Sequence, residues 1–443
     1  MRTRSTHHPP HVNVPDASVP QEIEVSDSAQ APSRRGTASG STLPDDPPAI
    51  SSTPASGPAV PRFPLPALIV MACTTFIGIV TETMPAGLLP QIARGLCVSD
   101  GAAGQLVSVY AVGAVLGAIP AVMLTRGARR KPLLCAGLLG FLLANTATAL
   151  APDLLVALLV RFVAGAFSGL LWGMLAGYAM RITAPERAGR ALAIAMAGIP
   201  IALAAGTPLG TWFGSTVGWR WAFAGSSLFT AVILISALIL VPDAPGQNAG
   251  TRIPLLKVLR IPGLATILGV VFLWLLAHNL LYTYIAPYLR QEHLDLKPDL
   301  ALVIFGVAAI GGIGITGMLV DRMLRRLTVA SVGLFVAAGL VLLATQGSKP
   351  FTILAIVLWG LSFGGSATQL QTAAGAATGE HADAAISMVT TAFNLAIFAA
   401  GAVGAVFVDG VGAKALPAVM IAFAAVALIA VGLGRRSAFR PGP

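Results

Sequence analysis

The chain has 443 residues, of which 56% are hydrophobic and only 10% are charged, and its formal net charge is +10. Soluble domains carry about 25% charged residues, so this composition, with a mean hydropathy of +0.81, excludes a water-soluble globular protein. In a membrane protein, a basic excess is typical of cytoplasmic loops, so the charge does not indicate a nucleic-acid partner.

Residues 1–65 are rich in Pro, Ser, Thr, Ala and Asp and show no apolar periodicity, so we expect a disordered cytoplasmic tail. The segment lacks the apolar core of a signal peptide. A translation start further downstream is an open alternative. Histidines in such a tail are usually solvated, and the three cysteines lack metal-ligand spacing, so we expect no metal site.

From Pro66 onward the sequence predicts twelve spans of roughly the twenty residues that a bilayer requires. The expected spans are 66–89, 103–124, 132–150, 154–180, 190–214, 221–241, 262–288, 299–320, 328–346, 350–377, 384–408 and 413–434. The longest internal connection contains Pro and Gly and separates two groups of six. The expected divisions are therefore a tail at 1–65, a first half at 66–241, a cytoplasmic linker at 242–261, a second half at 262–434 and a cytoplasmic tail at 435–443.

The distribution of Lys and Arg predicts the orientation. If the N-terminus is cytoplasmic, the inner loops and the C-terminal tail together hold sixteen of these residues and the outer loops hold six, which places both termini in the cytoplasm. The halves also resemble each other: each has a short basic turn after its second span, and the fifth and eleventh spans both have small residues about four apart. We therefore expect an all-α membrane protein with twelve transmembrane helices in two pseudo-symmetric halves, which is a plan of secondary transporters.

Two charges fall inside apolar spans. Glu82 lies in the first span and Arg161 in the fourth, and a charge at the centre of a bilayer costs about 2.5–3.5 kcal/mol even on insertion scales. Such residues usually face a partner or a water-filled cavity, so we expect both to be functional. The alternatives are that Glu82 tips toward the outer interface, because Pro90 ends the apolar run, and that Arg161 extends to the outer headgroups.

Several further residues are candidates for lining a substrate cavity. They share helical faces in four spans and combine aromatic rings with amides and hydroxyls, which suits neutral or weakly polar molecules. For His278, a structural role and proton handling are both open. The expected lining residues are Ser168, Trp172, Trp274, His278, Asn279, Tyr282, Ser366, Gln369 and Asn394.

The sequence GMLVDRMLRR at 317–326 resembles the cytoplasmic loop motif of the major facilitator superfamily. In that family the loop is a charged latch that stabilises the outward-facing state. The equivalent first-half loop departs from the pattern, since Arg126 stands where the family usually has Asp, so its latch is expected to find a carboxylate elsewhere. The resemblance implies latch roles for Arg129, Arg130, Asp321, Arg322, Arg325 and Arg326.

Other motifs are similar to the drug/proton antiporter branch, and the chain looks most like the bacterial arabinose, nucleoside and chloramphenicol efflux permeases. Arg161 and Gly165 match the Arg-x-x-x-Gly motif of the fourth helix, which implies that Glu82 and Arg161 couple transport to protons. The fifth span resembles the antiporter signature and implies packing roles for Gly206, Pro208 and Gly210. Thr83 and Thr207 depart from the usual Phe and Gly.

The resemblance implies a secondary active transporter of the bacterial inner membrane, associated with multidrug resistance. It would export a small organic molecule, such as a drug, sugar or nucleoside-like compound, in exchange for protons by alternating access. Its partners would be the substrate, protons and lipid, with no nucleic acid, no cofactor beyond the proton gradient, and a monomeric state. The alternatives are proton-coupled uptake and a non-transporting sensor; an enzyme is not expected, because no catalytic motif is present.

Overall fold

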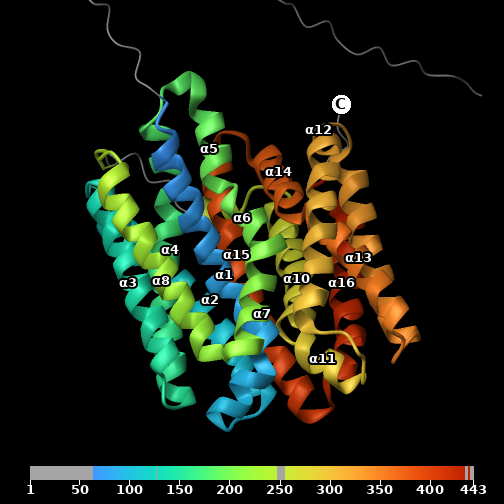
Figure 1. Ribbon diagram of the computed structural model, residues 1–443. Helices are drawn as coiled ribbons and strands as arrows, with labels where there is room; N and C mark the ends of the chain where they lie inside the picture. The colour runs from blue at the N-terminus through green and yellow to red at the C-terminus, as the bar shows by residue number, and fades with distance from the viewer. Residues whose placement is uncertain (1–62, 126, 247–254, 435–437, 440–443) are drawn as a thin grey trace, which may run out of the picture. The chain divides into compact units, whose positions relative to one another are not determined.

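The computed structural model (Figure 1) describes residues 63–125, 127–246, 255–434 and 438–439, and every regular element among them is helical. The predicted tail 1–65 therefore lies outside the described residues except for its last three, as do Arg126, the middle of the linker and most of the C-terminal tail. The first set of helices is α1 (Leu65–Leu96), α2 (Asp100–Thr125), α3 (Arg130–Leu150), α4 (Leu154–Arg181), η1 (Pro185–Arg187), α5 (Ala188–Met196), α6 (Gly198–Ile201), the π-helical η2 (Ala202–Gly206), α7 (Thr207–Val217) and α8 (Trp219–Leu240).

The second set begins after the linker. It comprises α9 (Leu255–Leu259), α10 (Leu264–Thr283), α11 (Ile285–Gln291), α12 (Pro298–Ala344), α13 (Lys349–Phe363), α14 (Ser366–Thr378), η3 (Gly379–His381), α15 (Ala382–Gly410), η4 (Ala413–Ala415) and α16 (Leu416–Leu433).

Ten helical stretches in the described part of the chain are long and apolar enough to cross a membrane. Their outward faces carry large apolar side chains that water would not accommodate well; on α8, for example, Leu228 is 70% exposed and Ile239 is 73% exposed. A hydrocarbon environment removes this cost, and helices satisfy their own backbone hydrogen bonds within it. The protein is therefore a multi-pass membrane protein.

The helix α12 covers two of the expected spans. A straight helix of its 47 residues would be roughly 70 Å long, more than twice the hydrocarbon thickness of about 30 Å. Met323 interrupts it with a non-helical backbone (φ −139°, ψ 30°), and the chain turns there at one end of the bundle.

The helix α1 is longer than the sequence predicts. Pro90 does not end it, because α1 continues to Leu96 with both Pro85 and Pro90 inside. A proline removes one backbone hydrogen bond, but membrane helices tolerate this loss where neighbouring groups compensate. Glu82 consequently lies in the middle of the helix rather than near its end.

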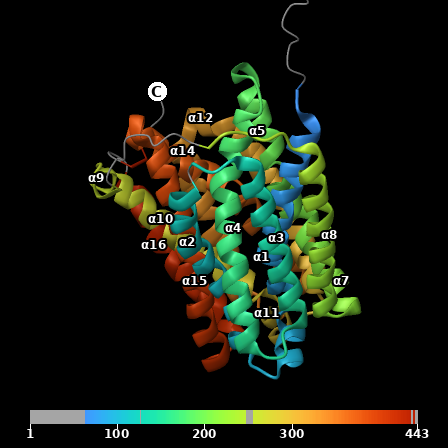
Figure 2. The same cartoon turned by 90° about the vertical axis from the view of Figure 1, so that its left-hand side faces the viewer.

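Glycines bring the helices of the first half close together. A Cβ on Gly165 of α4 would overlap the backbone carbonyl of Tyr110 in α2, and Figure 2 shows α4 beside α2. On the other side of the bundle, Gly206 would meet Val80 of α1 and Gly210 would meet Met84, with Pro208 in the first turn of α7. The elements that surround Glu82 and Arg161 are therefore held at backbone-contact distance.

We predict that Gly165→Val destabilises the protein, because the added side chain has no space against the α2 backbone. Overpacking of this kind costs roughly 1–3 kcal/mol or more. The matched control is Gly177→Val in the same helix, since no atom lies within 4 Å of the Cβ position there. Heating detergent-solubilised protein and measuring the monodisperse fraction should show a lower midpoint for Gly165→Val alone; equal midpoints would contradict the packing argument.

Candidate functional site

Arg161 is a buried cation inside the bundle. Its side chain has no exposed surface, its Nε donates a hydrogen bond to the Leu106 carbonyl at 3.2 Å, and its guanidinium lies 4.3 Å from the centre of the Tyr110 ring. The other two guanidinium nitrogens, Nη1 and Nη2, are buried without a hydrogen-bond partner. The side chain therefore points into the bundle rather than to the headgroups, and most of its hydrogen-bonding capacity is unused.

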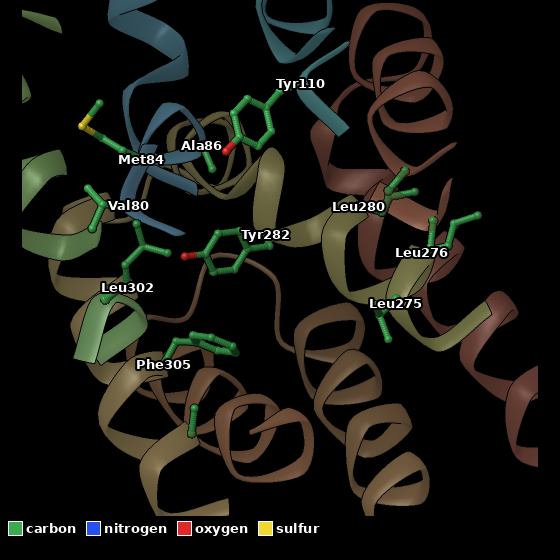
Figure 3. Close-up of a cluster of buried hydrophobic side chains, with 14 of the residues drawn as sticks. Val80, Met84, Ala86, Tyr110, Leu275, Leu276, Leu280, Tyr282, Leu302 and Phe305 are labelled. Atoms are coloured by element: carbon green, nitrogen blue, oxygen red, sulfur yellow. The ribbon is translucent and has the colours of Figure 1, made fainter. Parts of the chain in front are cut away.

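Glu82 on α1 is half-buried and lies within the electrostatic range of Arg161. The described residues contain no direct ion pair between the two groups. Tyr110 of α2 interacts electrostatically with both, and its buried hydroxyl lies close to the hydroxyl of Ser168 in α4. Figure 3 shows this hydroxyl beside Ala86, one helical turn after Glu82. An acid, a hydroxyl and a guanidinium from three helices thus share one region.

A small cavity lies between α1, α3 and α4, and Gly78 in its wall is one helical turn before Glu82. Its water-accessible volume is about 10 Å³, which is room for roughly one water molecule. Ser168 and Trp172, both expected to line a cavity, contribute to its wall together with Thr74, Thr75 and Gly78. The hydroxyls can hold a water, so the cavity places a polar niche close to the acid.

In the second half, His278 is surrounded by aromatic rings. Its Nδ1 accepts a hydrogen bond from Trp359 Nε1 at 2.9 Å, which leaves Nε2 to carry the proton of the neutral ring. The imidazole stacks on Phe363 with the ring centres 3.5 Å apart, and the tilted rings of Tyr282 and Phe305 have their centres 5.3 and 5.6 Å from its own. The histidine is therefore fixed in orientation by its neighbours.

The other residues that were predicted to line the cavity differ in burial and in hydrogen-bond partners. Trp274 is fully buried against Phe335 and Phe363, and Gln369 is fully buried and donates hydrogen bonds to Thr316 and Ser331. In this conformation these two residues join helices to each other. Ser366 is buried at the start of α14, whereas the half-buried Asn279 and Asn394 donate to backbone carbonyls of their own helices.

One polar contact near the acid was not anticipated from the sequence. Thr83, which follows Glu82, shares a hydrogen bond with Thr207 of α7 at 2.6 Å between hydroxyl oxygens. Thr83 also donates to the Ile79 carbonyl, so Thr207 is the donor between the two threonines. Tyr282 of the second half lies beside both hydroxyls. The two positions that depart from the family pattern are therefore in contact, which neither departure alone indicates.

The first-half loop finds a carboxylate at the end of the first half. Arg129 forms an ion pair with Asp243 at 2.5 Å, and the same carboxylate accepts a hydrogen bond from the backbone N–H of Lys131. That hydrogen bond, with the N–H of Ala244 and the charge of Arg129, holds the pKa of Asp243 below its usual value. Arg130 adds a backbone hydrogen bond to the Ala244 carbonyl. The segment after α8 is thereby attached to the α2–α3 turn.

The second-half loop has no comparable ion pair in the described part of the chain. Asp321, Arg322 and Arg326 are exposed around the bend in α12, and Nε of Arg325 is buried without a hydrogen-bond partner. A latch role for these four residues therefore stays a prediction.

Apolar helices of membrane-spanning length that enclose an acid and a cation are the arrangement expected of a membrane transport protein. Residues 71–400 match the model of the Major Facilitator Superfamily. The chain belongs to this family of transporters, so it is not an enzyme and it carries small molecules across a membrane.

Named relatives support this assignment. The chain is 30% identical over 383 residues to the inner membrane transport protein YdhP of Escherichia coli K12, covering 85% of this chain and 96% of that protein. It is 26% identical to a probable sugar efflux transporter of Helicobacter pylori P12 (79% and 90% covered) and 29% identical to a chloramphenicol efflux pump of Mycobacterium tuberculosis H37Rv (76% and 84% covered).

A solved structure shares the fold. The crystal structure of a bacterial homologue of the human lysosomal transporter Spinster superposes with a TM-score of 0.67 at 13% sequence identity, covering 85% of this chain and 98% of that chain.

We predict that Asp243→Asn lowers the thermal midpoint of the purified protein at pH 7, because it weakens the attachment to Arg129. The pKa of Asp243 is lower in the folded protein, so its contribution is fully present above the unfolded value of about 3.9 and is lost as the pH falls further. The difference between wild type and variant should therefore shrink below about pH 4.

Intrinsic tryptophan fluorescence measures both midpoints. Asp295→Asn is the control, since its side chain is fully exposed and lies 3.6 Å from Lys349. A midpoint for Asp243→Asn that equals the control at pH 7 would refute the attachment.

Proposed function

We propose that the chain is a proton-driven exporter of small organic molecules in the bacterial inner membrane, with Glu82 as the proton carrier and Arg161 as its electrostatic partner. The observation that carries the proposal is the buried guanidinium with two unpaired nitrogens near the half-buried acid. An ionised Glu82 compensates this charge, whereas a protonated Glu82 leaves it uncompensated. The two protonation states therefore favour different arrangements of α1 and α4, which is what coupling requires.

In this proposal Tyr110 positions the pair. Its ring faces the Arg161 guanidinium and its hydroxyl lies beside Ala86 of α1, so it can donate a hydrogen bond to the Glu82 carboxylate when the acid is ionised. The cavity at Ser168 supplies space for a water that could deliver the proton. No cofactor is required, because one charge that crosses 100 mV provides about 2.3 kcal/mol, enough for a roughly fortyfold gradient of a neutral substrate.

The proposed architecture has twelve spans, with both termini in the cytoplasm. Nine of the ten apolar stretches, the two arms of the tenth (α12) on either side of Met323, and α2 together supply twelve. The two halves would then rock around a central site between the Glu82 region and the aromatic residues around His278. Export, rather than uptake, is supported by relatives named as efflux proteins, and their names suggest phenicol antibiotics and sugars as the first compounds to test. We further propose that the monomer is sufficient and that residues 1–65 are dispensable for insertion.

We predict that expression of the wild-type chain in a bacterium that lacks its own exporters raises the inhibitory concentration of at least one compound in a panel of phenicols, sugar analogues and nucleosides. Glu82→Gln should abolish the protection, because the amide cannot exchange a proton. Glu186→Gln, at an exposed position after α4, is the matched control and should retain protection. Full protection by Glu82→Gln at equal membrane levels would remove the proton role, and accumulation of the compound in energised cells would indicate uptake.

The orientation is tested with a native cysteine. Cys97 is exposed in the α1–α2 turn, which the proposed orientation places outside the inner membrane. A membrane-impermeant maleimide should label it in intact cells. Labelling should disappear in Cys97→Gly, a change that suits the positive φ of 55° at this position. Labelling of Cys97 only in inverted vesicles would reverse the orientation.

A further inference from the structure

Several polar contacts join the first and second halves at the end of the bundle that carries α11 and the α1–α2 turn. Asp409, near the end of α15, accepts hydrogen bonds from the Ser99 hydroxyl at 2.7 Å and from the Gly101 backbone N–H at 3.1 Å. The carboxylate therefore lies at the N-terminus of α2, where unpaired N–H groups and the helix dipole favour a negative charge. A helix of one half is thus capped by a side chain of the other.

An ion pair reinforces this contact. Arg290 of α11 pairs with Asp100, the first residue of α2, and again one partner comes from each half. The Arg290 side chain is 54% exposed, so the pair lies at the rim of the interface rather than inside it.

Behind the rim, Tyr284 inserts between α2 and α15. It lies at the break between α10 and α11 and is fully buried. Its hydroxyl donates a hydrogen bond to the Gly401 carbonyl of α15 at 2.8 Å, within the second half, and lies 3.4 Å from the Gly101 carbonyl of α2, in the first half. A Cβ on Gly104 of α2 or on Gly404 of α15 would overlap its side chain. Glycine is needed at these two positions because the ring fills the space that a Cβ would occupy.

We propose that Asp409, Asp100, Arg290 and Tyr284 form the outer gate of the transport cycle, a role that rests on the orientation and the alternating access proposed above. The contacts of Asp409 with Ser99 and Gly101, of Arg290 with Asp100, and of Tyr284 with Gly101 and Gly104 each join one half to the other, so these contacts are lost when this end of the bundle opens. Water replaces the lost hydrogen bonds at the rim, which keeps the closed and open states close in free energy. The strength of the gate thereby sets how often the outer side opens.

The test uses a reporter cysteine behind the gate. Ser108 of α2 is fully buried and faces Gly401, so Ser108→Cys in a chain whose native cysteines are replaced should react slowly with an impermeant maleimide added to intact cells. Adding Asp409→Asn should raise the labelling rate about tenfold. This corresponds to a loss of roughly 1.4 kcal/mol in the free energy that favours the closed gate over the open one. Asp295→Asn is the matched control, because it removes an ion pair at the same end of the bundle within one half.

The readout does not depend on any substrate or on proton coupling. Equal labelling rates for Asp409→Asn and Asp295→Asn would overturn the gate, as would a faster rate seen only in inverted vesicles. If Asp409→Asn fails to reach the membrane, Ser99→Ala removes one of the same contacts and should still accelerate labelling. A gate that responds as expected in a protein that exports no compound would contradict the proposed function while leaving the gate intact.

Discussion

The burial of Arg161 without full pairing is the constraint on which the rest of the first half depends. A guanidinium removed from water needs compensation from an acid, a carbonyl or an aromatic face, and here the Leu106 carbonyl and the Tyr110 ring supply only part of it. Two nitrogens are left over. In the proposed mechanism, Glu82 compensates the remaining positive charge of Arg161. Because this acid can gain or lose a proton, the proposal lets the balance of charge inside the membrane change during a cycle.

The helix packing fixes the positions of the helices that carry Arg161, Tyr110 and Glu82. Gly165 lets α4 pack against the backbone of α2 beside Tyr110. This close packing keeps the Tyr110 ring next to the Arg161 guanidinium. Gly206 and Gly210 hold α1 against the segment that includes the π-helical turn η2, and the bond between Thr83 and Thr207 fastens the residue next to the acid. π-helical turns often occur at functional sites. The acid is thus carried by a helix that is fixed on one side and faces the charged region on the other.

The sequence alone could identify those functional residues whose charge conflicts with the apolar segment around them. Glu82 and Arg161 are charges in apolar runs, and the break in α12 follows from its length and its basic turn. Tyr110 could not be found, although it is the one aromatic residue of α2, because a tyrosine in a membrane helix is not unusual. The contacts of Tyr284 and Asp409 join positions 183 and 308 residues apart, and no local pattern specifies such pairs. Asp243 was missed because the loop motif places its acid within the loop itself.

The central claim is that the charge on Glu82, balanced against Arg161, links substrate movement to protons. The most direct measurement uses purified protein in liposomes that contain a pH-sensitive dye, with a compound that the chain exports supplied on one side. The account predicts that substrate flux in one direction drives proton movement in the other, and that Glu82→Gln eliminates the proton movement. Substrate flux without proton movement in the wild type, or wild-type proton movement in Glu82→Gln, would contradict it.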